Sequence, residues 1–251
     1  MLLDLSGISF GYTKTKLVLH GIDLTVTAGE NLGIVGESGS GKTTLLKLLL
    51  GLERASTGAI SFRGNPLDTS DRALMCSFRR SVQAVFQDPY SSLDPRQRVF
   101  DIIAEPLRSL KVDTDITASV MRALQDVDLP ADAAGRYPHE FSGGQRQRIA
   151  IARSMVAQPD LIIADEVVSA LDLTTRTRII DLLRALSARM TFVVVSHDIA
   201  LVALLCKRLV VLEKGRIVEQ GATREILARP MNPYTRKLLA STPRMPGMLA
   251  G

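Results

Sequence analysis

The sequence contains no tryptophan, and aromatic residues make up only 4% of its 251 positions. Aromatic rings provide the surfaces on which nucleic-acid bases stack, and no segment is a block of five basic residues, so we expect no nucleic-acid partner. The two cysteines, Cys76 and Cys206, lie far apart and form no CxxC pair. This pattern disfavours a disulfide scaffold or a cysteine zinc site and predicts two buried thiols.

Long apolar runs are also missing. The continuous apolar run 199–206 is much shorter than the roughly 18–20 residues that a membrane-spanning helix needs. Residues 1–4 have no basic region followed by a long apolar stretch, so we expect no secretion signal and a cytoplasmic protein. A net charge of +5 (31 basic minus 26 acidic residues) is mild and is compatible with an anionic lipid surface or an acidic partner nearby.

With 46% hydrophobic and 23% charged residues, the composition is that of a globular protein. Short apolar strands alternate with helices, which predicts an α/β fold with a mostly parallel sheet covered on both faces. Strands are expected at 3–10, 22–26, 32–35, 60–62, 82–86, 161–164, 192–195, 209–212 and 217–219, a turn at 64–66, and helices at 42–51, 116–127, 149–156, 179–186 and 199–206.

The same pattern predicts how the chain is organised. Residues 88–157 are helical in character and form a predicted insert within one domain that spans 1–251. Residues 1–87 and 158–222 then make up the core, and 223–251 form a short tail interrupted by prolines.

Residues 36–43, Gly-Glu-Ser-Gly-Ser-Gly-Lys-Thr, match the phosphate-loop pattern GxxxxGK[ST] in full. The match follows an apolar strand and precedes a helix, which argues against a chance glycine-rich turn. Glycines let successive backbone N–H groups turn inward and form an anion nest at a helix N-terminus. Lys42 then supplies a positive charge for the β- and γ-phosphates, and the Thr43 hydroxyl can ligate Mg²⁺.

Two carboxylates, Asp165 and Glu166, end the apolar run 161–164. The carboxyl end of a buried strand is where α/β sheets place groups that contact ligands. Asp165 would hold Mg²⁺ through its water shell, and Glu166 could orient and deprotonate the attacking water. Taken alone, the pair also fits acids that end a strand by facing solvent.

A second candidate anion cradle lies at 142–145, Ser-Gly-Gly-Gln, at the start of a helix before that strand. Free N–H groups, a hydroxyl and two glycines allow an anion to approach closely. The alternative interpretation is an N-cap followed by flexible glycines.

In this order, the motifs closely resemble those of the ATP-binding cassette (ABC) ATPases over essentially the whole chain. The resemblance identifies 36–43 as the Walker A loop, 142–145 as the signature motif, 161–165 as the Walker B strand and 169–172 as the D-loop. It implies a P-loop NTPase fold with a RecA-like core, an N-terminal antiparallel β subdomain and an inserted α-helical subdomain. It also implies ATP and Mg²⁺ as cofactors, and a head-to-tail dimer in which each ATP lies between one Walker A loop and the partner's signature motif.

The resemblance also implies roles for single residues. Glu166 is the catalytic carboxylate, His197 the switch histidine and Gln87 the Q-loop glutamine, while His20 and His139 are left as structural residues. The implied metal contacts are Thr43, Gln87 and Asp165. The implied nucleotide contacts are Tyr12, Gly36, Glu37, Ser38, Gly39, Ser40, Gly41, Lys42, Thr43, Thr44, Ser142, Gly143, Gly144, Gln145 and Asp172.

Four of these residues keep a plainer interpretation beside the functional one. Tyr12 fits a strand-end aromatic, Gln87 a helix-cap or turn residue, His197 a core histidine, and Asp172 an N-cap. For Asp172 the two roles are compatible.

Two further segments, Val-Phe-Gln-Asp-Pro at 85–89 with Ser-Ser-Leu-Asp-Pro at 91–95, and Arg-Pro-Met-Asn-Pro-Tyr-Thr at 229–235, resemble the dipeptide, oligopeptide and nickel importers. Val167 and Val168 stand where Pro-Thr is usual, and no cysteine follows Cys206. Many peptide ATPases of this group carry a cysteine cluster there. The valine at the second position, Val168, is similar to that of nickel import ATP-binding proteins and slightly favours metal over peptide cargo.

The implied function is the ATP-binding subunit of an importer of nickel, another metal chelate, or di- and oligopeptides. We expect it to be peripheral on the cytoplasmic face of the membrane. The implied partners are a second ATPase subunit, identical or paralogous, permease subunits and, indirectly, a solute-binding protein. The alternatives are a non-transport cassette acting in translation or DNA repair, and a P-loop kinase or GTPase, which would leave 142–145 unexplained.

Overall fold

The computed structural model describes residues 1–13, 15–169 and 171–241, except the side chains of Pro89 and Ser91. Ala170 in the predicted D-loop and the tail after residue 241 lie outside the described residues. The chain divides into two compact units, of which the first comprises Met1–Leu67 and Phe192–Gly251 and the second Asp68–Thr191.

The first unit begins with a four-stranded antiparallel sheet. Its central strand β1 (Leu3–Phe10) pairs with β2 (Leu19–Val26) and β4 (Thr57–Phe62), and β5 (Asn65–Pro66) adds to β4. Leu3, Leu5, Ile8 and Phe10 of β1 are buried, because alternate side chains of a strand point to the same face. The sequence predicted only a turn at 64–66, where the structure also forms β5.

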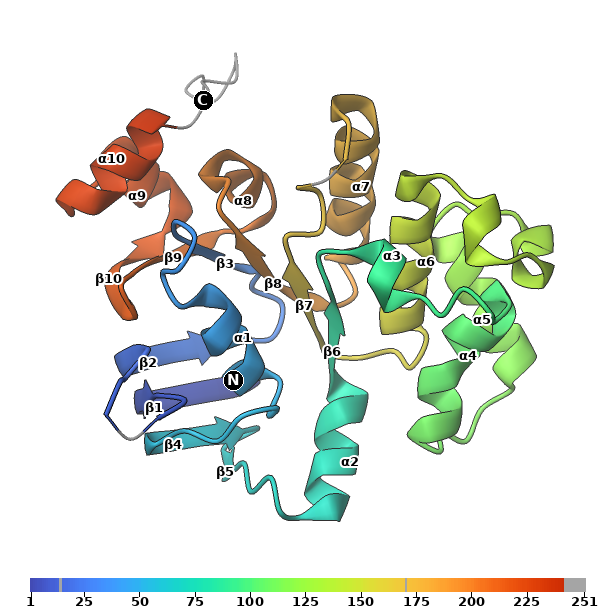
Figure 1. Ribbon diagram of the computed structural model, residues 1–251, viewed down its shortest axis with the longest axis horizontal. Helices are drawn as coiled ribbons and strands as arrows, with labels where there is room; N and C mark the ends of the chain where they lie inside the picture. Colours follow the sequence, from blue (N-terminus) through green and yellow to red (C-terminus); the bar gives the residue numbers. More distant parts are fainter. Residues whose placement is uncertain (14, 170, 242–251) are drawn as a thin grey trace. The chain divides into compact units, whose positions relative to one another are not determined.

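The same unit contains a second sheet that is mostly parallel (Figure 1). Strand β3 (Leu32–Val35) lies between β8 (Thr191–Ser196) and β9 (Arg208–Glu213) and is parallel to both, while β10 (Arg216–Ala222) is antiparallel to β9. A Cβ atom on Gly33 of β3 would overlap the side chain of Val202, so this glycine lets α8 approach the sheet closely. The helices are α1 (Lys42–Leu49), α8 (Ile199–Leu205), α9 (Thr223–Ala228) and α10 (Pro233–Ser241).

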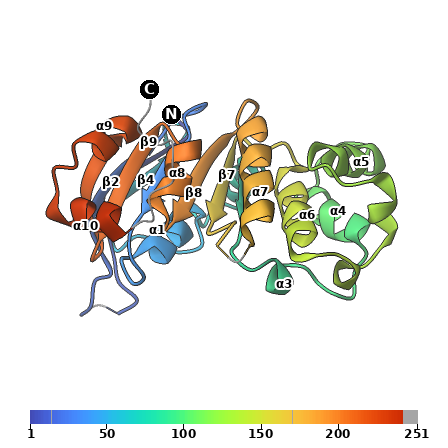
Figure 2. The ribbon, with the colours of Figure 1, turned by 90° about the horizontal axis from the view of Figure 1, so that it is seen from above.

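The second unit contains the parallel pair β6 (Val82–Val85) and β7 (Leu161–Asp165). Figure 2 shows α4, α5 and α6 gathered beside one another in this unit. Its helices are α2 (Arg72–Ser81), α3 (Pro89–Ser92), α4 (Val99–Ser109), α5 (Ile116–Asp126), α6 (Gly143–Met155) and α7 (Leu173–Leu186), with 3₁₀ turns at Ala131–Gly135 and Pro138–Glu140.

The predicted α/β class, with parallel and antiparallel sheets, is confirmed, but some details differ. Helix α2 was not predicted, although Met75 and Phe78 lie three residues apart and are both buried. The Asp71 carboxylate caps it by accepting from the N–H groups of Ala73 and Leu74. Cys206 is buried as predicted. Cys76 is only half-buried on α2, so the prediction of two buried thiols was wrong for it. Among the described residues, no helix is long and apolar enough to cross a bilayer.

Candidate nucleotide-binding site

The loop 36–43 connects β3 to α1 in the first unit, and its path depends on glycine. Gly39 and Gly41 have φ values of 79° and 108°, a region that other residues rarely adopt. A Cβ atom on Gly36 would overlap the carbonyl oxygen of Leu212, and one on Gly41 would lie 2.9 Å from Leu19 Cδ2. The loop is therefore enclosed on the protein side and carries little side-chain bulk of its own.

The polar groups of this loop fit an anionic ligand. The N-cap residue of α1 is Gly41, which has no side chain to bind the first N–H groups of the helix. The Nζ of Lys42 donates to the carbonyl oxygens of Gly36 (2.6 Å) and Glu37 (3.0 Å). Ser40 is buried, and its Oγ has no hydrogen-bond partner among the described residues. Thr43, the second residue of α1, is exposed, and a hydroxyl at this place suits an Mg²⁺ ion beside a phosphate.

Tyr12 lies beside the same helix, at the end of β1. Its Oη shares a hydrogen bond with Thr44 Oγ1 (3.5 Å) and accepts one from Lys47 Nζ (3.3 Å), and these two bonds lower the pKa of the phenol. The ring packs edge-on against Phe10, and 56% of the residue's surface is exposed. The structure therefore brings Tyr12 to α1 and leaves much of it accessible, as adenine stacking requires.

His197 follows β8 at the same edge of this sheet as the loop. The parallel register pairs Val35 with Ser196, so Gly36 and His197 extend from neighbouring strand ends. His197 is exposed, which contradicts its interpretation as a core histidine. The next residue, Asp198, caps α8 by accepting from the N–H groups of Ala200 and Leu201.

The predicted acidic pair lies in the second unit, at the end of β7. A φ of 50° at Glu166 turns the chain away from the strand, and Ser169 Oγ donates to the Glu166 carbonyl oxygen (2.9 Å). The Nε2 of Gln87, which follows β6, donates to the same Ser169 Oγ (3.4 Å). Gln87 and Glu166 are thereby connected through Ser169, while Asp165 ends the buried strand as predicted.

Val167 and Val168, the departures from the usual Pro-Thr, are each 2% exposed. Their burial among apolar side chains anchors the turn after Glu166 in the core. A proline at this place would restrain the chain in a different way, by restricting φ.

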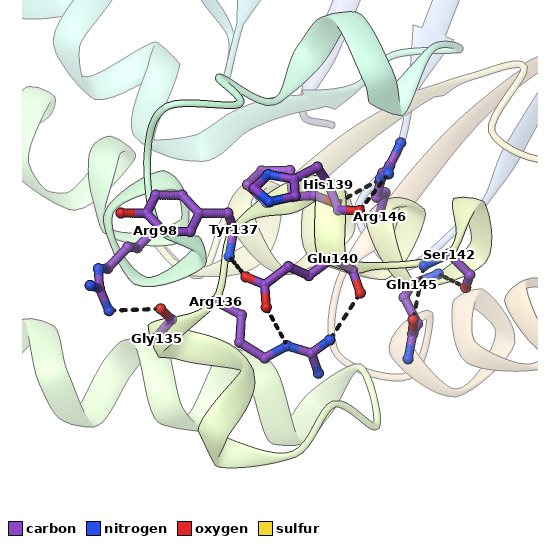
Figure 3. Close-up of polar contacts among 10 residues, drawn as sticks. Arg98, Gly135, Arg136, Tyr137, His139, Glu140, Ser142, Gln145 and Arg146 are labelled. Carbon is purple, nitrogen blue, oxygen red and sulfur yellow. Dashed lines mark hydrogen bonds and ion pairs between the residues drawn. The ribbon is translucent and has the colours of Figure 1, made fainter.

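The motif 142–145 forms the start of α6, and its polar contacts are drawn in Figure 3. The N–H of Ser142 donates to Gln145 Oε1 (3.0 Å), and the N–H of Gln145 donates to Ser142 Oγ (3.3 Å). This reciprocal pair is a capping box, so the predicted N-cap is present. It holds the turn in place without covering Gly143 and Gly144 with a side chain.

A polar network fixes the chain just before this motif (Figure 3). The Glu140 carboxylate accepts from the N–H of Tyr137 (2.6 Å) and pairs with Arg136; the backbone hydrogen bond is the main reason that the pKa of Glu140 is lowered. Arg146 Nε donates to the Pro138 carbonyl oxygen (2.7 Å), and its guanidinium lies 4.2 Å from the centre of the Tyr90 ring. The segment before α6 is thus attached to α6, and Arg146 also joins α6 to α3.

Asp172 caps α7, as one interpretation of the sequence predicted. Its Oδ1 accepts from the N–H of Thr175 (3.0 Å), and this bond is the main reason that the pKa of the carboxyl is lowered. A Cβ atom on Gly144 would overlap Thr175 Cγ2, so α6 and α7 approach each other closely at this point.

Several contacts of the site residues were not predicted. Arg153 of α6 donates to the Ser92 carbonyl oxygen (2.6 Å) and so fastens the segment after Gln87; burial lowers the pKa of this guanidinium, opposed by Glu105. Tyr234 and Lys237 of α10 contact Glu37 of the phosphate-binding loop. The sequence carries no local signal for these contacts, because they join positions far apart in the chain.

An enclosed glycine-rich loop between a buried parallel strand and a helix, with a lysine at its end, defines a P-loop nucleotide-binding protein. The family described as "ABC transporter" matches residues 19–169, and a second one, "Oligopeptide/dipeptide transporter, C-terminal region", matches residues 218–249. The chain belongs to the ABC transporter family, in its oligopeptide/dipeptide group.

Named relatives and solved structures agree with this assignment. The peptidoglycan transport ATP-binding protein YejF of Agrobacterium fabrum is 48% identical over 229 residues, which cover 89% of this chain and 42% of that protein. The oligopeptide transport ATP-binding protein OppF of Lactococcus lactis is 40% identical over 242 residues, 95% of this chain and 76% of the relative. The chain thus spans less than half of the first relative and about three quarters of the second.

Two solved structures have the same fold. The structure of cbiO1 from Clostridium perfringens, part of the ABC transporter complex cbiONQ, superposes with a TM-score of 0.82 at 29% identity, covering 91% of each chain. A dimeric post-hydrolysis state of the ATP-binding cassette MJ0796 bound to ADP and Pi gives a TM-score of 0.76 at 27% identity, covering 89% of this chain and 99% of the other.

Proposed function

We propose that this protein is the ATP-binding subunit of an importer and hydrolyses ATP to drive the uptake of di- or oligopeptides. The observation that carries the proposal is the phosphate-binding loop, whose glycines, Lys42 and Thr43 fit a triphosphate and its metal ion. The match of 218–249 to the oligopeptide/dipeptide C-terminal region, together with the name of the OppF relative, favours peptide over nickel.

In this proposal most nucleotide contacts come from residues of the first unit. Residues 36–42 bind the phosphates through backbone N–H groups and the Lys42 ammonium, with Thr44 as a further contact, and Tyr12 stacks on the adenine. Thr43, Asp165 and Gln87 would hold Mg²⁺, which would neutralise negative charge on the phosphates.

Hydrolysis is assigned to three residues. Glu166 aligns the attacking water and accepts its proton, and His197 stabilises the charge that develops on the γ-phosphate. Gln87, hydrogen-bonded to Ser169 in the turn after Glu166, senses the metal-bound nucleotide and transmits its presence to the helices that follow.

The proposed working form is a dimer in which each nucleotide also contacts residues 142–145 and Asp172 of the partner. The capping box at Ser142 supports this, because it fixes the start of α6, where Gly143 and Gly144 are half-buried and carry no side chain of their own. The partner is a second copy or a paralogue. Residues 88–157 form the helical subdomain that contacts permease subunits at the cytoplasmic face of the membrane, and a solute-binding protein delivers the cargo.

Substitution of the catalytic carboxylate tests this function. Glu166→Gln keeps the shape of the side chain but removes the base, so we expect ATP affinity within about threefold of the parent and turnover reduced at least ~100-fold. With ATP and Mg²⁺ the variant should elute as a dimer on size exclusion, and with ADP as a monomer. Glu225→Gln, an exposed change on α9, is the matched control and should leave turnover and elution unchanged. Turnover near the parental rate in Glu166→Gln contradicts the role of Glu166.

The cargo is tested by its binding protein. The tagged chain is purified from its own membranes with the accompanying permease and solute-binding protein. That binding protein is expected to bind di- or oligopeptides, and binding of Ni²⁺ chelates in their place contradicts the peptide assignment.

A further inference from the structure

Helix α10 places two side chains against the phosphate-binding loop. The Tyr234 hydroxyl accepts a hydrogen bond from the backbone N–H of Glu37 (2.8 Å), and Lys237 Nζ forms an ion pair with Glu37 Oε1 (3.2 Å). Tyr234 is only 9% exposed, whereas the ion pair is open to solvent. All three residues belong to the first unit, although Glu37 lies 197 positions before Tyr234 and 200 before Lys237 in the sequence.

The start of α10 is itself held firmly. The Glu219 carboxylate on β10 accepts from the N–H groups of Met231 (2.8 Å) and Asn232 (3.1 Å). Asn232 Oδ1 then accepts from the N–H of Tyr234 (2.8 Å), and Arg236 Nε donates to the Pro230 carbonyl oxygen (2.9 Å). These hydrogen bonds restrain residues 230–235 and thereby fix the position of the Tyr234 hydroxyl.

This segment restrains the phosphate-binding loop at Glu37, whose carbonyl oxygen is also bound by Lys42. The N–H of Glu37 is bound by Tyr234, and the carbonyl oxygen of Glu37 accepts from Lys42 Nζ (3.0 Å). On the other side of the loop, the Ser40 carbonyl oxygen accepts from the N–H of Gly215 in the turn between β9 and β10 (2.8 Å). Both ends of the glycine-rich stretch are thus tied to structure outside it.

We propose that Tyr234 and Lys237 are positioning residues that pre-organise the phosphate-binding loop for a nucleoside triphosphate. This rests on the proposed function, since it takes the loop to be the ATP site. A glycine-rich loop loses much conformational freedom when it closes on an anion, and restraints that exist before binding reduce that loss. The C-terminal segment thereby sets nucleotide affinity, while the rate of the chemical step depends on other residues.

The main test removes one hydroxyl from the purified full chain. Tyr234→Phe keeps the buried ring, so we expect the Kd for ATP and for ADP, measured by calorimetry with Mg²⁺, to rise roughly three- to tenfold, the range for one hydrogen bond. The KM for ATP should rise in parallel, and kcat should stay within about twofold. Ser187→Ala, which removes a hydroxyl that donates to the Arg184 carbonyl oxygen at the end of α7, is the control and should leave Kd unchanged.

Lys237 offers a second variant that does not disturb the core. Lys237→Ala is expected to raise the Kd for ATP about twofold at low salt, as for an exposed ion pair, and the difference should shrink at high salt. Lys237→Arg keeps the cation and should restore the parental Kd, and Lys207→Ala, another exposed lysine, should have no effect.

The outcomes separate this inference from the function on which it rests. If the parent chain binds no ATP, the proposed function fails. If the parent binds ATP but folded Tyr234→Phe and Lys237→Ala bind it equally well, the positioning role is overturned. A fall in kcat with unchanged Kd also overturns it, because pre-organisation acts on binding. Should Tyr234→Phe not fold, the Lys237 series alone decides.

Discussion

The backbone at Glu166 is held in a conformation that a residue with a side chain seldom adopts. A positive φ is costly for a residue with a Cβ, by about 1–2 kcal/mol, and is maintained only when its surroundings enforce it. Here Ser169 binds the Glu166 carbonyl oxygen through both its N–H and its hydroxyl, and buried Val167 and Val168 anchor the turn. These contacts hold the turn by which the chain leaves the strand at Glu166.

The two cysteines differ in their surroundings, and this predicts a difference in reactivity. Burial raises the pKa of the Cys206 thiol to about 12, against a weaker opposing hydrogen bond from the Val194 backbone, whereas Cys76 is half-buried. Because the thiolate is the reactive form, we expect Ellman's reagent at pH 8 to modify one thiol in the folded chain and two in urea. Rapid reaction of two thiols in the folded chain contradicts this.

The same thiol affects stability at alkaline pH. In the unfolded chain Cys206 ionises near its ordinary pKa of 9.0, while in the folded chain it stays protonated up to about 12. Its contribution to stability is therefore complete below pH 9 and is lost progressively between pH 9 and 12. Cys206→Ala should flatten the pH dependence of the unfolding midpoint in that window.

At the scale of elements, the close approach of α6 and α7 depends on Gly144. We expect Gly144→Ala to lower the free energy of unfolding by about 1–3 kcal/mol, because the added methyl overlaps the Thr175 methyl. In a chain that also carries Thr175→Ser, the obstructing methyl is gone, and alanine should then stabilise α6 by up to about 1 kcal/mol. Urea unfolding of the two single variants and the double variant measures this change of sign, and equal effects of Gly144→Ala in both backgrounds argue against it.

For the whole molecule, nucleotide binding should be visible as stability. A ligand present at 100 times its Kd stabilises the folded state by about 2.7 kcal/mol, so a non-hydrolysable ATP analogue with Mg²⁺ should raise the melting temperature by roughly 5–10 °C. Lys42→Ala removes the cation that is assigned to the phosphates and should abolish the shift, while Lys207→Ala should keep it. An undiminished shift in Lys42→Ala contradicts the assignment of the loop as the nucleotide site.

Much of this protein is determined by local sequence. The loop 36–43 could be recognised because its glycines, lysine and threonine are consecutive, and the buried strands β3 and β7 because continuous apolar runs are typical of sheets covered on both faces. The N-caps at Ser142 and Asp172 were also predicted, because a cap and its N–H partner lie within three residues.

Tertiary structure decided the rest. The contact of Tyr234 with Glu37 joins positions 197 residues apart, and the approach of Gly144 to Thr175 depends on how two helices pack. The half-buried position of Cys76 likewise follows from packing, because α2 buries Met75 and Phe78 but leaves Cys76 between its buried and exposed faces. Hydrogen-bonding capacity and periodicity can be read from a few neighbouring residues, but which distant groups meet is fixed only when the whole chain has packed.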